Sequence, residues 1–335
     1  MTPFQYARAN DVADAIKQIA TDPSARFIAG GTNLLDLIKY DVAAPTKLID
    51  ISRLPLGNVE QTATGGVMIG ALVANTDLAY HPLIEERYPL LSRAILAGAS
   101  QQLRNMASTG GNLVQRTRCF YFYDATTPCN KREPGSGCSA IDGINRINAI
   151  LGTSESCIAT HPSDMCVALA ALEATVHVTG PAGSRTIALV DFHRLPGDTP
   201  QRDTNLEPDE IITAIELPPK GFSTNYSYLK IRDRLSYAFA LVSVAAALQM
   251  DGNTVRSARI ALGGVAHKPW RATSAEQMIA GKPLDSTTLR NAANAALSEA
   301  KPLHDNAFKV RLAQNAIVRA VNQAASGTSG AGGFA

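Results

Sequence analysis

A short region crowded with cysteines limits what this chain can fold into more than any other part of its sequence. The segment RCFYFYDATTPCNKREPGSGC, residues 118–138, holds three of the five cysteines, and Cys157 brings to four those that fall within 39 residues. Prolines and glycines interrupt the segment, and no run within it predicts a helix or a buried strand. An odd number of cysteines in a chain without a recognisable export signal argues against a disulfide framework. The region therefore indicates metal or redox chemistry.

The residues alone leave three interpretations of these thiols open. Four cysteine thiolates are the usual ligands of a 4Fe-4S cluster. A single zinc ion bound by four cysteines usually takes them from two closely spaced pairs, which this region lacks. Unliganded thiols would need apolar, packed surroundings, which a loop rich in proline and glycine is not expected to offer. The fifth cysteine, Cys166, lies in the apolar run MCVALAAL and is expected to be a packed thiol on a buried helix.

Charged and aromatic side chains flank the cysteines. We expect the cations to offset the negative charge of four thiolates and the aromatic rings to shield the site from water. The cations are Arg116, Arg118, Lys131 and Arg132, and the rings are Phe120, Tyr121, Phe122 and Tyr123.

The composition is that of an ordinary globular protein and excludes several functions. The chain has 335 residues, 45% of them hydrophobic and 18% charged, which is enough for two or three domains. Its net charge of +2 provides no basic field for nucleic acid. No apolar run is long enough to cross a membrane, and residues 1–18 do not resemble a signal peptide. We expect folding in the cytoplasm, with any export carried by a partner.

The order of the predicted elements indicates an α+β fold. Strands and helices alternate in the first part, and a meander of three long strands followed by helices occupies the last part. The break PPKG at 218–221 predicts a boundary between a domain at 1–220 and a second at 224–325. The Gly/Ser-rich residues 326–335 are expected to form a disordered tail. Helices are predicted at 11–20 and 89–100 and near 272–280, 287–300 and 305–324. Two more are predicted, one after the glycine pair within 25–40 with Leu34, Leu35 and Ile38 inward, and one after an N-cap at Ser163 or Asp164.

Two glycine pairs carry the first indication of a cofactor. Residues 30–35 read GGTNLL and residues 108–112 read STGGN, and neither supplies the G-x-G-x-x-G pattern of a Rossmann fold. Adjacent glycines let a backbone approach a ligand closely with free N–H groups, and the hydroxyl and amide neighbours add donors. Together these features suit a pyrophosphate, although each pair alone is also compatible with a plain tight turn.

These motifs resemble the FAD-binding medium subunits of the molybdenum hydroxylases, the xanthine dehydrogenase family. The motifs are RFIAGGTNLLDLIK, GALVANTDL, STGGNLVQRTRC, HPSDM and YLKIRDRLSYAFALVSVAAAL, in that order along the chain. The resemblance as a whole covers the chain from Phe4 to about residue 325. The cysteine region at about 116–160 is most similar to that of the FAD and 4Fe-4S subunit of bacterial periplasmic aldehyde oxidoreductases. The resemblance implies a vanillyl-alcohol-oxidase/PCMH-type FAD-binding domain made of two subdomains, followed by an α+β domain of the CO dehydrogenase flavoprotein type.

The resemblance also implies a set of site residues. Asp164 would bind the flavin or its ribityl chain, and Lys230 would approach the isoalloxazine ring. The first glycine motif would line the diphosphate and adenine side through Arg26, Phe27, Ile28, Ala29, Gly30, Gly31, Thr32, Asn33 and Leu34. The second would contribute Ser108, Thr109, Gly110, Gly111 and Asn112. The metal ligands would be Cys119, Cys129, Cys138 and Cys157.

What the resemblance implies for function is electron transfer in a larger enzyme. The chain would take electrons from 2Fe-2S clusters of a small subunit, after a large molybdenum-cofactor subunit has oxidised an aldehyde, and pass them through FAD to an external acceptor. The assembly would be a heterotrimer or a dimer of heterotrimers, exported to the periplasm on a partner's signal. No residue of this chain is expected to be catalytic. The alternatives are a stand-alone FAD oxidoreductase and a zinc-stabilised, non-enzymatic interaction module.

Overall fold

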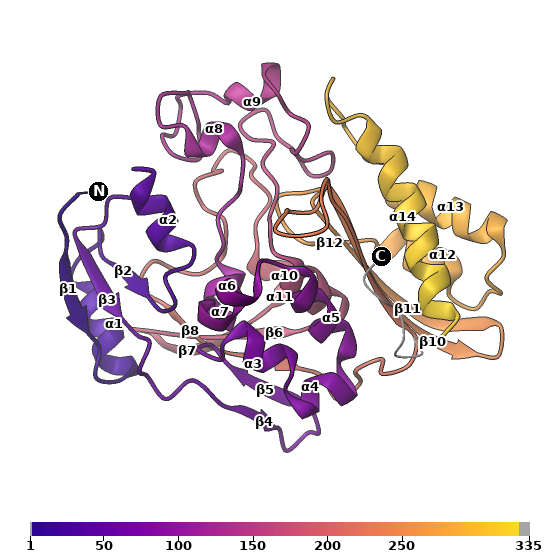
Figure 1. Cartoon of the computed structure of the whole chain (residues 1–335), viewed down its shortest axis with the longest axis horizontal. Coiled ribbons are helices and arrows are strands. Elements are labelled where there is room, and N and C mark those ends of the chain that lie inside the picture. The colour runs from indigo at the N-terminus through magenta and orange to yellow at the C-terminus, as the bar shows by residue number, and fades with distance from the viewer. Residues whose placement is uncertain (1, 328–335) are drawn as a thin grey trace.

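The computed structural model describes residues 2–327 and contains three β-sheets that follow one another along the chain (Figure 1). The N-terminal sheet lies at one end, a five-stranded sheet lies in the middle, and a four-stranded sheet with its helices lies at the other end. Most of the predicted tail, residues 328–335, lies outside the described residues. The mixture of sheets and helices confirms the α+β class.

The N-terminal sheet is parallel, with the order β1-β3-β2. The helix predicted at 11–20 forms as α1, and Asp11 caps it because its carboxylate accepts the N–H of Asp14 at 2.7 Å. The inward face predicted for the next helix is partly wrong, because Leu37 and Ile38 are buried while Leu35 is 37% exposed. The elements are β1 (Gln5–Arg8), α1 (Val12–Ala20), β2 (Arg26–Ile28), α2 (Leu34–Lys39) and β3 (Lys47–Asp50).

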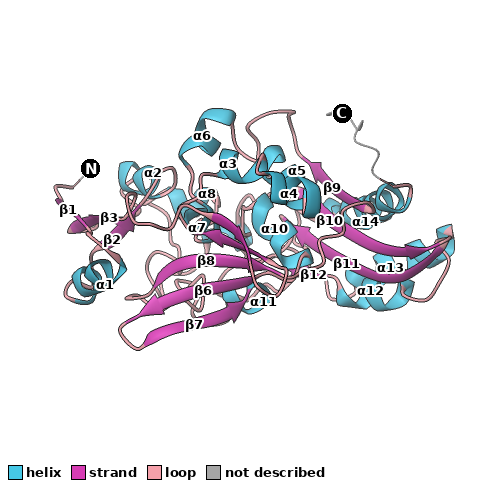
Figure 2. Cartoon of the chain, turned by 90° about the horizontal axis from the view of Figure 1, so that it is seen from below, coloured by secondary structure: helices cyan, strands magenta, loops and turns pink. Residues whose placement is uncertain are grey.

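The middle sheet is antiparallel throughout and has the order β4-β5-β8-β6-β7. Figure 2 shows its strands β8, β6 and β7 side by side. Its strands are β4 (Val59–Gln61), β5 (Val67–Gly70), β6 (Thr175–Gly180), β7 (Gly183–Ala188) and β8 (Ile211–Leu217). Short helices link it to the rest of the domain: α3 (Asn75–Ala79), α4 (Pro82–Arg87), α5 (Pro89–Ala97), α6 (Gln101–Met106), α7 (Thr109–Leu113) and α11 (Leu189–Phe192).

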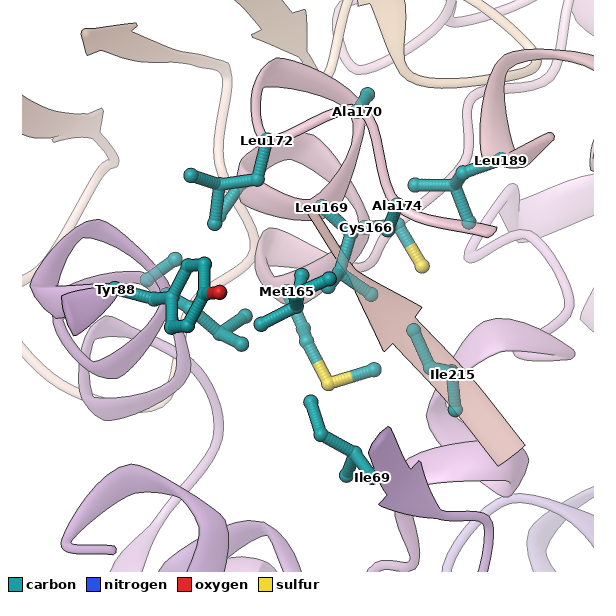
Figure 3. Close-up of a cluster of buried hydrophobic side chains, with 14 of the residues drawn as sticks. Ile69, Tyr88, Met165, Cys166, Leu169, Ala170, Leu172, Ala174, Leu189 and Ile215 are labelled. Carbon is teal, nitrogen blue, oxygen red and sulfur yellow. The ribbon is translucent and has the colours of Figure 1, made fainter. Parts of the chain in front are cut away.

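Helix α10 (Asp164–Ala171) lies at the centre of the molecule, and all of its residues are buried. It contacts α5 and α7 on one side and strands β10 (Val242–Asp251) and β11 (Thr254–Gly263) of the next sheet on the other. Figure 3 shows Met165 and Cys166 among apolar side chains that include Ile69, Leu172 and Ile215. Cys166 is 0% exposed, which confirms the packed thiol predicted from the apolar run.

The C-terminal sheet is an antiparallel meander with the order β12-β11-β10-β9. Successive side chains of a strand point to opposite faces, and both faces of β10 are buried. Val244 and Ala246 pack with the C-terminal helices, whereas Ala245 and Ala247 pack with the core around α10. The remaining elements are β9 (Tyr226–Ile231), β12 (Trp270–Arg271), α12 (Thr273–Ile279), α13 (Ser286–Ala296) and α14 (Phe308–Ala325).

The cysteine region projects between the two ends of the molecule in Figure 1 and is almost as irregular as predicted. Only two short helices form in it, α8 (Phe120–Tyr123) and α9 (Ser139–Asp142). Its apolar side chains pack against Leu37 of α2 and against Leu303, which precedes α14. The region therefore connects the N-terminal and C-terminal parts of the chain. No helix within residues 2–327 has the length and apolar character that a membrane span requires.

Candidate cofactor-binding site

A cavity of about 570 Å³ opens where the two glycine motifs, the start of α10 and strand β9 meet. Its size falls within the range of about 300–1,000 Å³ that is usual for small-molecule sites. Every residue that the sequence predicted to bind a dinucleotide lines this cavity, with the exceptions of Arg26, Thr109 and Gly110. Residues distant in sequence are thus brought to one place.

The first glycine turn presents free backbone donors to the cavity. None of the five amide N–H groups from Gly30 to Leu34 donates a hydrogen bond to the described part of the chain. Gly31 has φ +71°, and a Cβ atom on Gly30 would lie 1.7 Å from the carbonyl oxygen of Met106. Only glycines permit this conformation and this close approach to the end of α6. The free amides can bind an anion such as a phosphate.

The second glycine motif offers fewer free amides than its sequence led us to expect, because only the N–H of Ser108 donates no hydrogen bond within the described part of the chain. It forms the first turn of α7, where Thr109 N–H donates to the Val73 carbonyl at 2.9 Å and Gly110 N–H donates to the Ala71 carbonyl at 2.7 Å. The N–H of Gly111 donates to the Ser108 hydroxyl at 3.2 Å. Two of its backbone donors therefore attach α7 to the segment that follows β5, and a third caps the helix.

Three of the predicted residues do not line the cavity, because the side chain or backbone of each is directed elsewhere. The guanidinium of Arg26 donates to the carbonyls of Pro23 and Ala25 at 2.9 and 2.6 Å, ahead of the strand. The hydroxyl of Thr109 donates to the Val73 carbonyl at 2.8 Å. Gly110 packs against Ala71.

Asn112 joins the second motif to the start of α10. Its amide nitrogen donates to Asn75 at 2.6 Å, and its amide oxygen accepts the hydroxyl hydrogen of Ser163 at 2.6 Å. Asn75 is 2% exposed and lines the cavity, and its Nδ2 atom has no hydrogen-bond partner. Asn75 was not predicted, although its motif GALVANTDL was noticed. A buried donor without a partner suits a bound polar ligand.

A buried ion pair forms the opposite wall of the cavity. The Nζ atom of Lys230 lies 2.8 Å from Oδ2 of Asp164 and 3.0 Å from the carbonyl oxygen of Ala97. The hydroxyl of Tyr228 donates to Oδ1 of Asp164 at 2.6 Å, and burial together with this carboxylate raises the pKa of Tyr228 well above its usual value. Tyr228 was not predicted. Its position two residues before Lys230 on the same strand face could have identified it.

Arg118 lies in the large cavity, not beside the thiols that it was expected to neutralise. Its guanidinium donates to Asn33 at 3.0 Å and to Asp36 at 3.1 Å, and it stacks over the ring of Phe239 at 5.1 Å from the ring centre. Arg118 therefore holds the first glycine turn to the start of the cysteine region. Phe239, like Tyr237 beside it, lines the cavity and was not predicted from the sequence.

The four thiols predicted to bind metal line a second, smaller pocket. Cys129 and Cys138 are paired as neighbours in an isolated antiparallel bridge, and Cys119 and Cys157 are 8% and 6% exposed. Burial raises the pKa of Cys157 to about 12. A metal that binds here must displace these protons.

The surroundings of the thiols differ from the expectation in two respects. Apolar side chains pack around them, including Phe122, Ile158 and Ala159, although the sequence is rich in proline and glycine. Phe120 is 60% exposed and does not shield the site.

Of the four expected cations, only Lys131 lines the thiol pocket. Its ammonium is buried and bonds to Asp203, to the Pro200 carbonyl at 2.7 Å and to His267 at 2.7 Å. Arg116 forms an ion pair with the same Asp203. Arg132 donates to the carbonyls of Tyr121 and Phe122 at 2.6 and 2.9 Å and so fastens the backbone of the region.

A third cluster, the buried His161, Cys166 and His193, lies beside the start of α10. One potential ligand atom from each lies within 4.8 Å of the other two, and in residues 2–327 no other group of three or more His, Cys, Asp or Glu is gathered so closely. The two rings are in edge contact at 4.3 Å, and His193 Nε2 lies 2.8 Å from the Leu113 carbonyl. Burial lowers the pKa of His193 to about 4. The cluster is therefore composed of neutral, packed side chains.

Known proteins resemble this chain over nearly its whole length. Residues 2–220 match the family described as the FAD binding domain in molybdopterin dehydrogenase, and residues 226–324 match the CO dehydrogenase flavoprotein C-terminal domain. The aldehyde oxidoreductase FAD-binding subunit PaoB of Escherichia coli is 51% identical over 97% of this chain and 99% of its own. The glyceraldehyde dehydrogenase medium chain of Sulfolobus acidocaldarius is 29% identical over 90% of each chain.

Solved structures agree with these matches. A carbon monoxide dehydrogenase from Hydrogenophaga pseudoflava superimposes with a TM-score of 0.77 and 27% identity, covering 97% of this chain and 99% of that one. The resemblance found in the sequence motifs, and the two domain types that it implied, are thereby confirmed. The chain belongs to the FAD-binding medium subunits of the molybdenum hydroxylases.

Proposed function

We propose that FAD binds in the 570 Å³ cavity with its diphosphate on the free amides of residues 30–34. The donor set supports this placement, because one end of the cavity offers main-chain N–H groups and the other offers Asp164 and Lys230. The unpartnered amide of Asn75 adds a further buried donor to the lining of the cavity. The free amides of the first turn are the single observation that carries this assignment.

The four thiols are proposed to hold a 4Fe-4S cluster. Cys119, Cys129, Cys138 and Cys157 supply the number and kind of ligands that such a cluster requires. A single zinc ion with Zn–S bonds of 2.3 Å needs its sulfurs about 4 Å apart. No three of these sulfurs are grouped within 4.8 Å of one another, which favours the larger cluster.

The chain then acts as an electron-transfer subunit of a molybdenum-dependent aldehyde oxidoreductase. Aldehyde as the substrate of the complex follows from the name of the relative that is 51% identical. Partners would be a large molybdenum-cofactor subunit and a small subunit with 2Fe-2S clusters. When bound, FAD accepts two electrons and the cluster accepts one, which lets the pair pass electrons to an external acceptor. The residues of this chain bind and orient these groups and exclude water from them.

Cofactor analysis of the complex purified without oxygen tests both assignments. Absorbance, FAD content, iron and acid-labile sulfide are measured for the wild type and for two variants. Cys129→Ser should lose the iron assigned to this chain and keep FAD. Cys166→Ser is the matched control, because its thiol is packed in α10, and it should keep both.

The outcomes separate the alternatives. A complex without FAD would overturn the flavin assignment, and zinc in place of iron would favour the interaction module. A fully active flavoprotein without partners would favour the stand-alone oxidoreductase. Loss of iron in Cys166→Ser but not in Cys129→Ser would replace the proposed ligand set.

A further inference from the structure

Asn148 brings a side-chain donor to one of the proposed cluster ligands. Its amide nitrogen Nδ2 lies 3.6 Å from Sγ of Cys119, within the range of an N–H···S hydrogen bond. Asn148 is 2% exposed and lines the thiol pocket. No other side chain in the described part of the molecule donates a hydrogen bond to any of the four sulfurs. Among the described residues that line the pocket, Asn148 is therefore the one whose side chain bonds to a sulfur.

The amide can serve this role in only one of its two orientations. With Nδ2 toward Cys119, the sulfur receives a donor, and the amide oxygen Oδ1 is left without a partner. The reverse orientation would place a carbonyl oxygen against a thiolate, two groups that both carry negative charge and only accept hydrogen bonds. A ligated, deprotonated Cys119 therefore stabilises the orientation found.

Hydrogen bonds from the C-terminal helix α14 hold the backbone around Asn148 in place. Lys309 of α14 is 0% exposed, and its ammonium donates to the carbonyl of Asn148 at 2.8 Å, to that of Ile147 at 3.4 Å and to that of Gly264. An ammonium group has three N–H donors, and those of Lys309 are matched by these three carbonyl oxygens. The side chain at 148 is thus held at a fixed distance from the sulfur.

We propose that Asn148 is a positioning residue that raises the reduction potential of the cluster by hydrogen bonding to Cys119, and that Lys309 holds it in place. This inference rests on the proposed function. Reduction adds negative charge that spreads onto the cysteine sulfurs, so a donor to sulfur stabilises the reduced state more than the oxidised state. The C-terminal helix would in this way influence the cluster without touching it.

A redox titration of the purified complex, followed by the electron paramagnetic resonance signal of the reduced cluster, tests the proposal. Asn148→Leu keeps the volume and lacks donors, and its midpoint potential should shift to more negative values with iron content unchanged. Asn148→His should restore a potential near that of the wild type, because its Nδ1–H stands at the same distance along the side chain as Nδ2 of asparagine. Lys309→Met should shift the potential in the same direction as Asn148→Leu.

Asn306→Leu is the matched control, since it removes a buried asparagine that bonds to the same segment without reaching a sulfur. It should leave the potential unchanged. An unchanged potential in Asn148→Leu would overturn the proposal, as would an equal shift in Asn306→Leu. If Asn148→Leu loses iron, Asn148→Ala, which is smaller and has neither a donor nor a charge, decides by the same criterion. Absence of iron from the wild type would refute the cluster assignment itself and is recognised before any titration.

Discussion

Lys230 and Asp164 form a buried ion pair with an Nζ–Oδ2 distance of 2.8 Å, although they lie on a strand and a helix of different domains. The side chains are 5% and 8% exposed, so neither charge is well hydrated. Removing one partner of such a pair leaves the other charge buried and uncompensated. The pair therefore joins the two halves of the molecule at the wall of the cavity, and we expect cofactor binding to depend on their contact.

The first prediction is that Lys230→Met lowers both stability and flavin content. Loss of the ammonium leaves Asp164 unpaired and should reduce the free energy of unfolding by about 3–5 kcal/mol. The FAD-to-protein ratio and the urea midpoint of flavin release measure the two effects. Lys220→Met, at an exposed position, is the control and should match the wild type. Full flavin content in Lys230→Met would argue against a role for this pair.

A smaller effect is expected for Tyr228→Phe, which removes the hydroxyl that donates to Asp164 at 2.6 Å. A hydrogen bond to a charged group contributes about 1.5–3 kcal/mol, and here Lys230 still neutralises the carboxylate. Flavin should therefore be released at a lower urea concentration than in the wild type but at a higher one than in Lys230→Met. An equal loss in both variants would mean that the hydroxyl matters as much as the charge.

The sequence identified much of the lining of the large cavity, because a backbone pattern defines the first glycine turn. The glycines at 30 and 31 are specific because a positive φ and a backbone contact at Met106 tolerate no side chain. The same pattern misled at Thr109 and Gly110, because a glycine pair does not reveal whether its amides face a ligand or a neighbouring strand. Asn75, Tyr228 and Phe239 were missed because their roles depend on tertiary contacts. The 4Fe-4S cluster and the periplasmic location stay predictions.

The positive φ of Gly31 leads to a third prediction. A Cβ atom at this position would lie 2.9 Å from Cδ1 of Leu35, and a residue with a side chain avoids φ +71° at a cost of about 1–2 kcal/mol. Gly31→Ala should therefore turn the free amides of residues 30–34 away from the cavity and weaken FAD binding at least tenfold. Titration of the apo-subunit complex with FAD, followed by flavin fluorescence, gives the affinity.

Gly57→Ala provides the comparison for this substitution. A Cβ atom there meets nothing within 4 Å, and its φ lies outside the left-handed region. FAD affinity should therefore remain at the wild-type value. If both alanine variants bound FAD equally well, the first glycine turn would not be the diphosphate site.

The last prediction concerns acid stability and rests on His193. Burial lowers its folded-state pKa to about 4 from an unfolded value near 6.5, so the unfolded chain binds a proton in this window that the folded chain does not. Stability should therefore fall as the pH drops from about 6.5 to 4, by up to about 1.4 kcal/mol per pH unit for this one group.

His193→Gln, which keeps a donor for the Leu113 carbonyl, should reduce that slope. His304→Gln is the control, because it removes a histidine whose side chain is 58% exposed. It should leave the pH dependence of stability unchanged. Urea midpoints of flavin release at pH 7.5, 6.0 and 5.0 measure the slopes, and identical slopes in the wild type and His193→Gln would contradict the prediction.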